Sequence, residues 1–369
     1  MGVYEELGVR PLINAWGTIT RVGGSRMHPD VLEAMREASL SFVDMHELHS
    51  VAGESIAKLL GVPAACVTSG AAAGLAIAAA ACMARSNPSK ILELPDTGSM
   101  RNEALVLKSH RILYDQGLRL SGARFVEIGV TSYAAVEQIE EAITDRTAMF
   151  FYSAEAVRMR GSLALDVIAR LLKPHGIPII VDAAAELPPS SNVTAFLEAG
   201  ANLVVFSGGK ELRGPQSSGL ILGSEHLISH CDANSFPNYG VGRSMKTDKE
   251  TIVGLVKAVE LFVRRDYGVI RATWDEMVDT MVAGLGGTES ITIRRGFPTQ
   301  AGVQPADVAR AYIQTLNNTA LELQAMLRDG SPSVAVGVEG TELVLNPQCL
   351  EWDEIEPLVL AVKKALSSE

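Results

Sequence analysis

The stretch from Leu203 to Gly223 constrains the fold of this chain more than any other. An apolar run ends at Ser207, two glycines follow, and Lys210 stands directly after them, before a second apolar run begins at Leu220. Such runs are typical of buried strands, and the glycines between them mark turns. A lysine at the rim of a buried strand loses hydration, which lowers its pKa and makes its amine a usable nucleophile. The alternative is an ordinary surface lysine in a loop.

A second polar residue ends a buried strand upstream. Residues 177–181 form a continuous apolar run, typical of a strand in a parallel sheet, and Asp182 follows it. Since the chain from Asp182 to Lys210 is long enough for a helix and a strand, we expect both residues at carboxyl ends of strands in one α/β sheet, where ligands bind. A buried carboxylate near an amine nucleophile suits pyridoxal 5'-phosphate (PLP), whose aldehyde binds lysine and whose ring nitrogen pairs with aspartate. The small Ala184 leaves room for a flat ring.

A phosphate site is expected at the start of an alanine-rich helix. Ser69, Gly70 and Ala71 follow a short predicted strand, 65–67, and open that helix. A helix start carries free backbone amides and the positive end of the helix dipole, so it favours a phosphate group. Simple helix capping is the alternative.

Two further predicted strands, 104–108 and 148–152, end in polar residues at the same edge of the sheet. His110 follows the first strand, and its flat imidazole is suited to stack on a cofactor ring; a hydrogen-bonded structural histidine is the alternative. Ser153 and Glu155 follow the second strand, and either is suited to hydrogen-bond the cofactor's phenolic oxygen or the substrate.

Four cations lie in glycine-containing segments of an acidic protein: Arg21, Arg213, Arg243 and Lys246. Arginine pairs bidentately with carboxylate and phosphate oxygens, so we expect these residues to bind an anionic substrate. Bridging between subunits is the alternative. The apolar N-terminal arm and the basic loop have no evident use within one subunit, which predicts a homodimer or a higher homo-oligomer.

Composition narrows the class of protein. The 369 residues are 47% hydrophobic and 20% charged, which is ordinary for a globular enzyme, and a net charge of −11 argues against nucleic-acid binding. No apolar stretch approaches the ~20 residues that span a bilayer, and the acidic N-terminus lacks an export signal. We therefore expect a cytoplasmic protein without membrane contact or a metal site. Its four cysteines, expected as free thiols, are Cys66, Cys82, Cys231 and Cys349.

The patterns predict an N-terminal arm (1–28), a large PLP-binding domain (29–250), a linking helix (251–271) and a small C-terminal α+β domain (272–369). In the large domain we expect a helix that places Val31, Met35, Ala38 and Phe42 on one face. In the small domain we expect strands at 290–295, 334–338 and 342–346 and helices at 306–316 and 352–366.

The motif around the lysine, Ser-Gly-Gly-Lys-Glu-Leu-Arg-Gly-Pro-Gln-Ser-Ser-Gly, resembles the cofactor-lysine motif of bacterial selenocysteine synthase (seryl-tRNA selenium transferase) and its shorter relatives. The opening Ile-Asn-Ala-Trp-Gly-Thr-Ile-Thr-Arg, the stretch Phe-Val-Asp-Met with Glu-Leu-His, and Thr-Ser-Gly-Ala-Ala match the relatives as well. The resemblance covers nearly the whole chain. The shorter relatives look like D-glucosaminate-6-phosphate ammonia lyase, a PLP enzyme that removes water and ammonia from an amino sugar acid.

The resemblance implies a fold-type I PLP-dependent transferase fold (aspartate aminotransferase-like), with a mostly parallel sheet in the large domain and a small α+β C-terminal domain. It implies that Lys210 carries the cofactor, that Asp182 pairs with the pyridinium nitrogen, and that His110 and Ala184 flank the ring. The residues implied for the phosphate are Ser69, Gly70, Ala71 and Ser207. Related sulfur-transferring enzymes often have a glutamine where this chain has Ala185, so the resemblance does not identify the residue that holds the phenolic oxygen.

Three reactions share this cofactor chemistry. The first is an ammonia lyase or dehydratase reaction in carbohydrate catabolism, in which Lys210 takes the Cα proton of a 2-amino-3-hydroxy acid and a 2-keto-3-deoxy acid and ammonia form. The expected substrate is an amino acid or amino sugar acid, most simply D-glucosaminate 6-phosphate. The second is racemisation, epimerisation or aldol cleavage, which the sequence does not separate from elimination. The third, selenium transfer on a charged tRNA, needs a basic surface that an acidic chain lacks. A non-enzymatic binding role would leave the lysine without a use.

Overall fold

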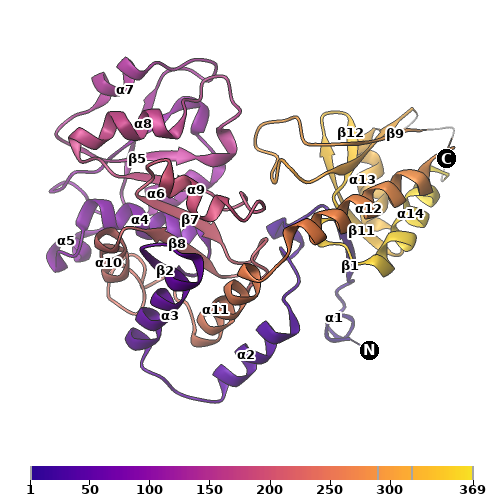
Figure 1. Ribbon diagram of the computed structural model, residues 1–369, viewed down its shortest axis with the longest axis horizontal. Helices are drawn as coiled ribbons and strands as arrows, with labels where there is room; N and C mark the ends of the chain where they lie inside the picture. Colours follow the sequence, from indigo (N-terminus) through magenta and orange to yellow (C-terminus); the bar gives the residue numbers. More distant parts are fainter. Residues whose placement is uncertain (1, 289–290, 317–318, 368–369) are drawn as a thin grey trace. The chain divides into compact units, whose positions relative to one another are not determined.

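The computed structural model describes residues 2–288, 291–316 and 319–367, which form two compact units (Figure 1). The large unit comprises residues 27–264. The small unit combines the N-terminal residues up to Arg26 with the residues from Arg265 onward. None of the described helices is long and apolar enough to span a membrane.

A seven-stranded sheet with the order β2-β8-β7-β6-β5-β3-β4 forms the centre of the large unit. All neighbouring strands are parallel except β8, which runs antiparallel to β2 and β7. The carboxyl ends of six strands therefore meet at one edge. The strands are β2 (Ala64–Thr68), β3 (Glu103–Leu107), β4 (Arg124–Ile128), β5 (Thr147–Ser153), β6 (Ile179–Asp182), β7 (Leu203–Ser207) and β8 (Gly219–Gly223).

Helices cover this sheet. They are α2 (Pro29–Ser39), α3 (Met45–Leu60), α4 (Ala71–Ala84), α5 (Pro88–Glu93), α6 (Gln116–Leu120), α7 (Val136–Ala142), α8 (Leu165–Leu172), α9 (Asn192–Glu198), α10 (Glu225–Asn234) and α11 (Lys249–Val263). Helix α4 contacts β5, β6, β7 and β8 on one side and α6 and α10 on the other, so it is buried nearly all round. Its small residues allow this close approach: a Cβ at Gly74 would lie only 2.8 Å from Cγ1 of Val205.

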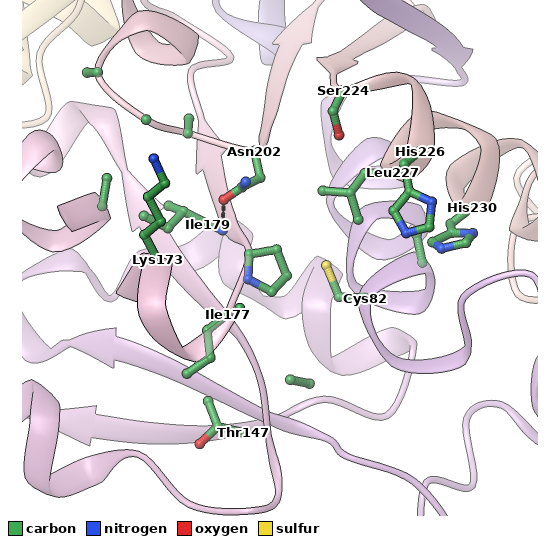
Figure 2. Close-up of a pocket in the computed structure, with 18 of the residues that line it drawn as sticks. Cys82, Thr147, Lys173, Ile177, Ile179, Asn202, Ser224, His226, Leu227 and His230 are labelled. Carbon is green, nitrogen blue, oxygen red and sulfur yellow. Dashed lines mark hydrogen bonds between the residues drawn. The ribbon is translucent and has the colours of Figure 1, made fainter. Parts of the chain in front are cut away.

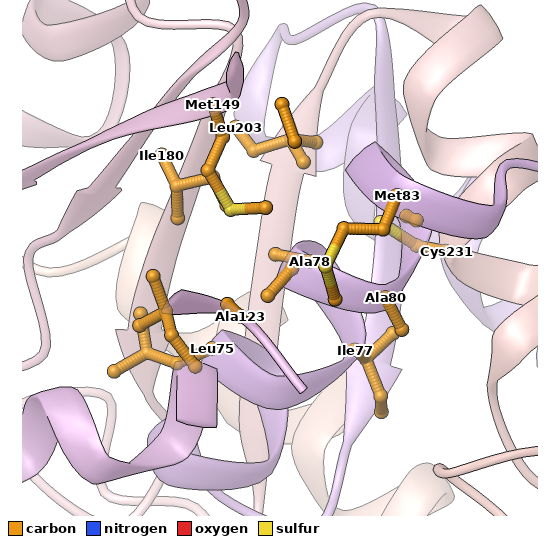
Figure 3. Packing of buried hydrophobic residues seen from close by; sticks show 14 of the residues in the cluster. Leu75, Ile77, Ala78, Ala80, Met83, Ala123, Met149, Ile180, Leu203 and Cys231 are labelled. Atoms are coloured by element: carbon orange, nitrogen blue, oxygen red, sulfur yellow. The ribbon is translucent and has the colours of Figure 1, made fainter. Parts of the chain in front are cut away.

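The core of the large unit lies between α4 and the sheet (Figure 3). Leu75 and Ile77 from α4 pack there with Met149 from β5, Ile180 from β6 and Leu203 from β7, and each is at most 1% exposed. Because protein interiors are close-packed, this layer holds the strand ends in fixed register, and with them the polar residues that follow.

The small unit contains a five-stranded sheet with the order β1-β11-β12-β10-β9. Strand β1 (Leu12–Ala15) pairs in parallel with β11 (Ser333–Glu339), and the other pairs are antiparallel. The remaining elements are α1 (Val3–Glu6), α12 (Tyr267–Leu285), β9 (Ile291–Gly296), β10 (Arg310–Thr315), α13 (Ala320–Asp329), β12 (Glu342–Leu345) and α14 (Trp352–Leu366). The residues expected as an N-terminal arm thus contribute a strand to this sheet.

The helix predicted at 306–316 is wrong, because β10 occupies this stretch. Strand β10 lies between β9 and β12, and nearly all its residues are buried. Burial on both faces suits Tyr312 and Ile313, whose side chains favour strands, and this tertiary context overrides the helical spacing of the apolar residues. The strands predicted at 334–338 and 342–346 and the helix at 352–366 are confirmed; Ser290, at the start of the strand predicted at 290–295, lies outside the described residues.

Two other expectations fail at helix ends. Helix α2 ends at Ser39, so Phe42 is not on its buried face and is fully exposed. The new helix α3 begins after Asp44, whose carboxylate accepts hydrogen bonds from the amides of His46 and Glu47. The segment 251–271 is not one linking helix, because α11 ends at Val263, in the large unit, and α12 begins in the small one.

Candidate active site

The sheet register brings the predicted polar residues to one edge. Gly219 of β8 is the register partner of both Thr68 at the end of β2 and Ser207 at the end of β7. Asp182 of β6 pairs with Ser153 of β5 on one side. Segments that are far apart in the sequence therefore end side by side, at the carboxyl edge where α/β sheets bind ligands.

The loop that carries Lys210 is held by its own backbone. The amide of Gly208 donates to the Ser218 carbonyl at 2.8 Å, and the amide of Gly214 donates to the Gly208 carbonyl at 2.8 Å. The amide of Arg213 donates to the Lys210 carbonyl at 2.9 Å. These three bonds close the loop on itself, so the backbone of the lysine has a defined position just past the end of β7.

The charges of three carboxylates at this edge act on the Lys210 amine. Burial lowers the pKa of Lys210, and the negative charges of Asp182, Glu155 and Glu186 oppose that shift. Asp182 is 7% exposed, and its Oδ1 accepts a hydrogen bond from the amide of Ala184 at 3.0 Å. Burial raises the pKa of Asp182, while the Ala184 bond and the charge of Lys210 act in the opposite direction. A buried carboxylate with so little compensation suits a cationic ligand group.

Glu155 and Glu186 are half-buried acids at this edge. Burial raises the pKa of Glu155, and the charge of Asp182 adds to the shift. Burial, followed by the charges of Glu155 and Asp182, raises the pKa of Glu186 to about 7. Our sequence interpretation missed Glu186. Its position in the loop directly after the Asp182 strand was the available indication, since that loop must lie at the ligand-binding edge.

His110 lies in a short 3₁₀ turn directly after β3 and is fully buried. Its Nδ1 accepts a hydrogen bond from the Ser153 amide at 3.1 Å, so the proton resides on Nε2, which lies 2.8 Å from Oγ of Ser162. Its ring lies against Tyr152, with 4.4 Å between the ring centroids. Burial lowers the pKa of His110 to about 4, so it is neutral. This geometry matches the structural alternative; stacking on a cofactor ring stays a prediction.

The start of α4 has the properties of an anion site. Gly70 is the N-cap residue with φ of 112°, and it has no side chain to cap the amides of the first turn. Its backbone passes very close to Gly219, where a Cβ would lie only 2.6 Å from the Gly70 carbonyl oxygen. Ser69 donates its hydroxyl to the Met245 carbonyl at 3.1 Å, which ties this site to the basic loop 238–249.

The donor set fits PLP. Open amides at the start of α4 suit a phosphate, the Lys210 amine suits an aldehyde, and the buried Asp182 suits a protonated ring nitrogen. Among the described residues, Oγ of Ser109 and Oγ of Ser153 are buried without a hydrogen-bond partner. Buried hydroxyls are rarely left unpaired, so these two are available to a ligand at this edge.

The predicted cations divide between the two units. Arg243 and Lys246 both lie over the Phe236 ring, at 5.3 and 5.9 Å from its centroid, and belong to the loop that accepts the Ser69 bond. Arg213 lies in the lysine loop at a φ of 55°. Arg21 belongs to the small unit, where it lies 5.7 Å from the centroid of the Trp16 ring.

A wide groove of about 750 Å³ lies at the opposite, amino edge of the sheet (Figure 2). Thr147 at the start of β5 and Asn202 just before β7 line it, together with Cys82, Lys173 and His230. None of the predicted site residues lines this groove. Its position at the wrong end of the parallel strands separates it from the lysine.

This chain is similar to a known protein family and to known proteins over two thirds of its length or more. Residues 12–350 match the family model described as L-seryl-tRNA selenium transferase (SelA). D-glucosaminate-6-phosphate ammonia lyase of Salmonella typhimurium is 34% identical over 70% of this chain and 69% of its own length. The 5'-C-glycyluridine monooxygenase-decarboxylase of a Streptomyces species is 31% identical over 98% of this chain and 92% of its own.

A solved structure of D-glucosaminate-6-phosphate ammonia-lyase superposes with a TM-score of 0.85 at 27% identity, covering 99% of this chain and 98% of that one. Serine palmitoyltransferase of Sphingomonas wittichii superposes with a TM-score of 0.59 at 14% identity, covering 96% of this chain and 87% of that one, and shows a likeness of fold alone. The predicted fold-type I architecture is confirmed.

Proposed function

Because this chain belongs to the L-seryl-tRNA selenium transferase (SelA) family, we propose that it is a PLP-dependent lyase of that family, which removes water and ammonia from a 2-amino-3-hydroxy acid. The observation that carries the proposal is that the buried Asp182 ends β6 while Lys210 follows β7, its parallel neighbour, at the carboxyl edge of the sheet. The relatives named for an ammonia lyase support the choice of reaction.

The residues at this edge have distinct roles in binding the cofactor. Lys210 would carry the aldehyde and Asp182 the ring nitrogen, with His110 and Ala184 beside the ring. The phosphate would be held by Ser69, Gly70, Ala71 and Ser207. When bound, PLP delocalises the electron pair that remains after the Cα proton has left.

Lys210 is suited to move that proton. Burial lowers the pKa of its amine, so a larger fraction is unprotonated near neutral pH and able to accept a proton. Asp182 is suited to pair its negative charge with a cationic ring nitrogen. Among the described residues, its carboxylate accepts one hydrogen bond, from the Ala184 amide. The positive charge of the ring nitrogen would offset the free-energy cost of burying the Asp182 carboxylate.

The proposed substrate is D-glucosaminate 6-phosphate. The names of two relatives support it, and so does the placement of Arg243 and Lys246 on the loop that Ser69 contacts. A phosphate at the far end of the substrate would meet these two cations, whereas Ser153, Glu155 and Arg213 would meet its carboxylate or hydroxyl groups. Arg21 is proposed as a further substrate contact.

A second candidate is oxidative decarboxylation of a 2-amino acid. The observation that favours it is the Streptomyces relative, which matches nearly the whole chain, in contrast to the 70% covered by the Salmonella lyase. Both reactions begin with the same cofactor and differ in which bond to Cα breaks.

The test is a panel of 2-amino-3-hydroxy acids, with and without a terminal phosphate, incubated with the PLP-loaded protein. Formation of keto acid and ammonia in equal amounts without oxygen uptake supports the lyase. Release of carbon dioxide with oxygen uptake supports the second candidate. A change of configuration at Cα with no product of either kind would contradict both.

A further inference from the structure

Glu186 is not assigned a role in binding the cofactor, yet hydrogen bonds fix its backbone at the same edge of the sheet. Its amide donates to the Ala183 carbonyl at 3.1 Å, in the turn that follows β6. Its carbonyl accepts a hydrogen bond from Nδ2 of Asn192 at 2.7 Å, which anchors the turn to the start of α9. The side chain is half-buried, and no hydrogen bond to its carboxylate is found among the described residues.

Burial and neighbouring charges give Glu186 a higher pKa than an ordinary surface glutamate. Glu155 from the 3₁₀ turn after β5 and Asp182 from β6 both repel a negative charge on it. Lys210 and Arg158 attract that charge, but burial and the two acids outweigh them and raise the pKa of Glu186 to about 7. A substantial fraction of Glu186 is therefore protonated at neutral pH, unlike a typical glutamate.

Elimination of a hydroxyl group needs a proton donor as well as a base. Hydroxide is a poor leaving group, and the amine that accepts the Cα proton is not free to donate at the same moment. Resting on the proposed function, we propose that Glu186 is the acid that protonates the β-hydroxyl of the substrate as the Cβ–O bond breaks. Its turn follows β6 and the Lys210 loop follows β7, the parallel neighbour of β6, so both segments lie at the same edge of the sheet. Glu186 thus supplies the second proton-transfer group that this reaction requires.

The step balances in atoms and electrons. The Lys210 amine takes the Cα proton, and the electron pair of that bond becomes the Cα–Cβ double bond. The Cβ–O electron pair leaves with oxygen, which receives the Glu186 proton and departs as water. Glu186 is then a carboxylate and Lys210 an ammonium ion. Uptake of one water by the released enamine yields the 2-keto-3-deoxy acid and ammonia, so no oxidant or reductant is needed.

The experiment compares leaving groups in Glu186→Gln, which removes the proton donor but keeps the shape of the side chain. With a β-hydroxy substrate, kcat should decrease on the order of 10²-fold or more, the usual contribution of a general acid. With a β-chloro substrate, which needs no protonation, kcat should stay within about threefold of the unmodified enzyme. The matched control is Glu198→Gln, the same change on the exposed side of α9, which should leave both rates unchanged.

Two readouts do not depend on turnover. Exchange of the substrate's Cα hydrogen in D₂O, followed by NMR, should persist in Glu186→Gln because Lys210 is intact. In the protein without cofactor, a carboxyl resonance that titrates near pH 7 should disappear in this variant. If the variant does not fold, Glu186→Asp provides the same comparison of leaving groups with a shortened acid.

Equal losses with the hydroxy and chloro substrates would overturn the assignment of Glu186, as would a selective loss in Glu155→Gln instead. Failure of the proposed function looks different. In that case the unmodified enzyme itself eliminates water from no 2-amino-3-hydroxy acid, with or without a terminal phosphate.

Discussion

The amide of Ser153 donates a hydrogen bond to Nδ1 of His110 at 3.1 Å and thereby selects the neutral Nε2-protonated form of a fully buried histidine. This bond joins the ends of β5 and β3 at the edge where the candidate site lies. It makes His110 part of the scaffold, whatever further contact it makes with a ligand.

Replacement of His110 by alanine should destabilise the protein without cofactor. The buried Ser153 amide would lose its partner, at a cost of about 1–3 kcal/mol. The half-buried Ser162 hydroxyl would retain its bond to the Leu163 carbonyl. Denaturant unfolding of the cofactor-free protein measures this loss. An unchanged unfolding free energy, with only the holoenzyme affected, would instead support a role confined to stacking on the cofactor ring.

The pH dependence of stability provides a separate check on His110. Its folded pKa of about 4 is below the unfolded value of 6.5, so the unfolded chain binds more protons between these pH values. The contribution of neutral His110 is therefore complete above pH 6.5 and is lost as pH decreases toward 4, by about 3 kcal/mol. Glu186 has a raised pKa and acts with the opposite sign, so the difference between the unmodified protein and His110→Asn isolates the histidine.

Lys210→Ala should abolish both activity and the visible absorbance of protein purified with PLP. The yellow colour depends on the covalent link between the lysine amine and the aldehyde. The other lysine among the predicted site residues is Lys246, which is exposed. Absorbance spectra with a Lys246→Ala control decide the matter. Retention of the same band in Lys210→Ala would assign the cofactor to another amine.

Asp182→Asn should retain the fold but lose most turnover, on the order of 10²-fold or more in kcat, because an amide does not stabilise a protonated ring nitrogen. The fold should survive because the side chain keeps its shape and the Ala184 amide keeps an oxygen acceptor. Circular dichroism and steady-state kinetics measure the two effects. Near-normal turnover would place the ring nitrogen elsewhere.

Arg243→Ala or Lys246→Ala should raise KM for a phosphorylated substrate much more than for its unphosphorylated analogue. Both cations lie over Phe236 on the loop that Ser69 contacts, so both are available to one terminal phosphate. Parallel kinetics with the two substrates measure the ratio. Equal effects on both, or preference of the unmodified enzyme for the unphosphorylated substrate, would refute the phosphate contact.

The protein should assemble into at least a homodimer. Leu40, Phe42 and Val43, in the connection between α2 and α3, are 74%, 102% and 49% exposed, and adjacent exposed apolar side chains are typical of an interface. Sedimentation of the unmodified protein and of Phe42→Ser measures the mass, and the variant should dissociate at a higher concentration. An unmodified monomer with full activity would contradict this prediction.

The strands of the large unit were predictable because a strand buried on both faces is a continuous apolar run, and the residue that ends the run is visible in the sequence. Asp182 and Lys210 were found in this way. Glu186 was not, because nothing in its neighbourhood indicates which side chains of a loop turn toward the site. Its altered pKa comes from Glu155 and Asp182, whose proximity depends on the pairing of β5 with β6.

The sequence by itself determined which segments of the large unit are buried strands, which residue ends each of them, and that a lysine and an aspartate share one edge. Tertiary structure decided the rest. Whether 310–315 is a strand or a helix depended on the strands beside it, and the role of His110 depended on the Ser153 amide, 43 positions away. The physical reason is that burial patterns are local properties of the chain, whereas hydrogen-bond partners and neighbouring charges are set by segments that only folding brings together.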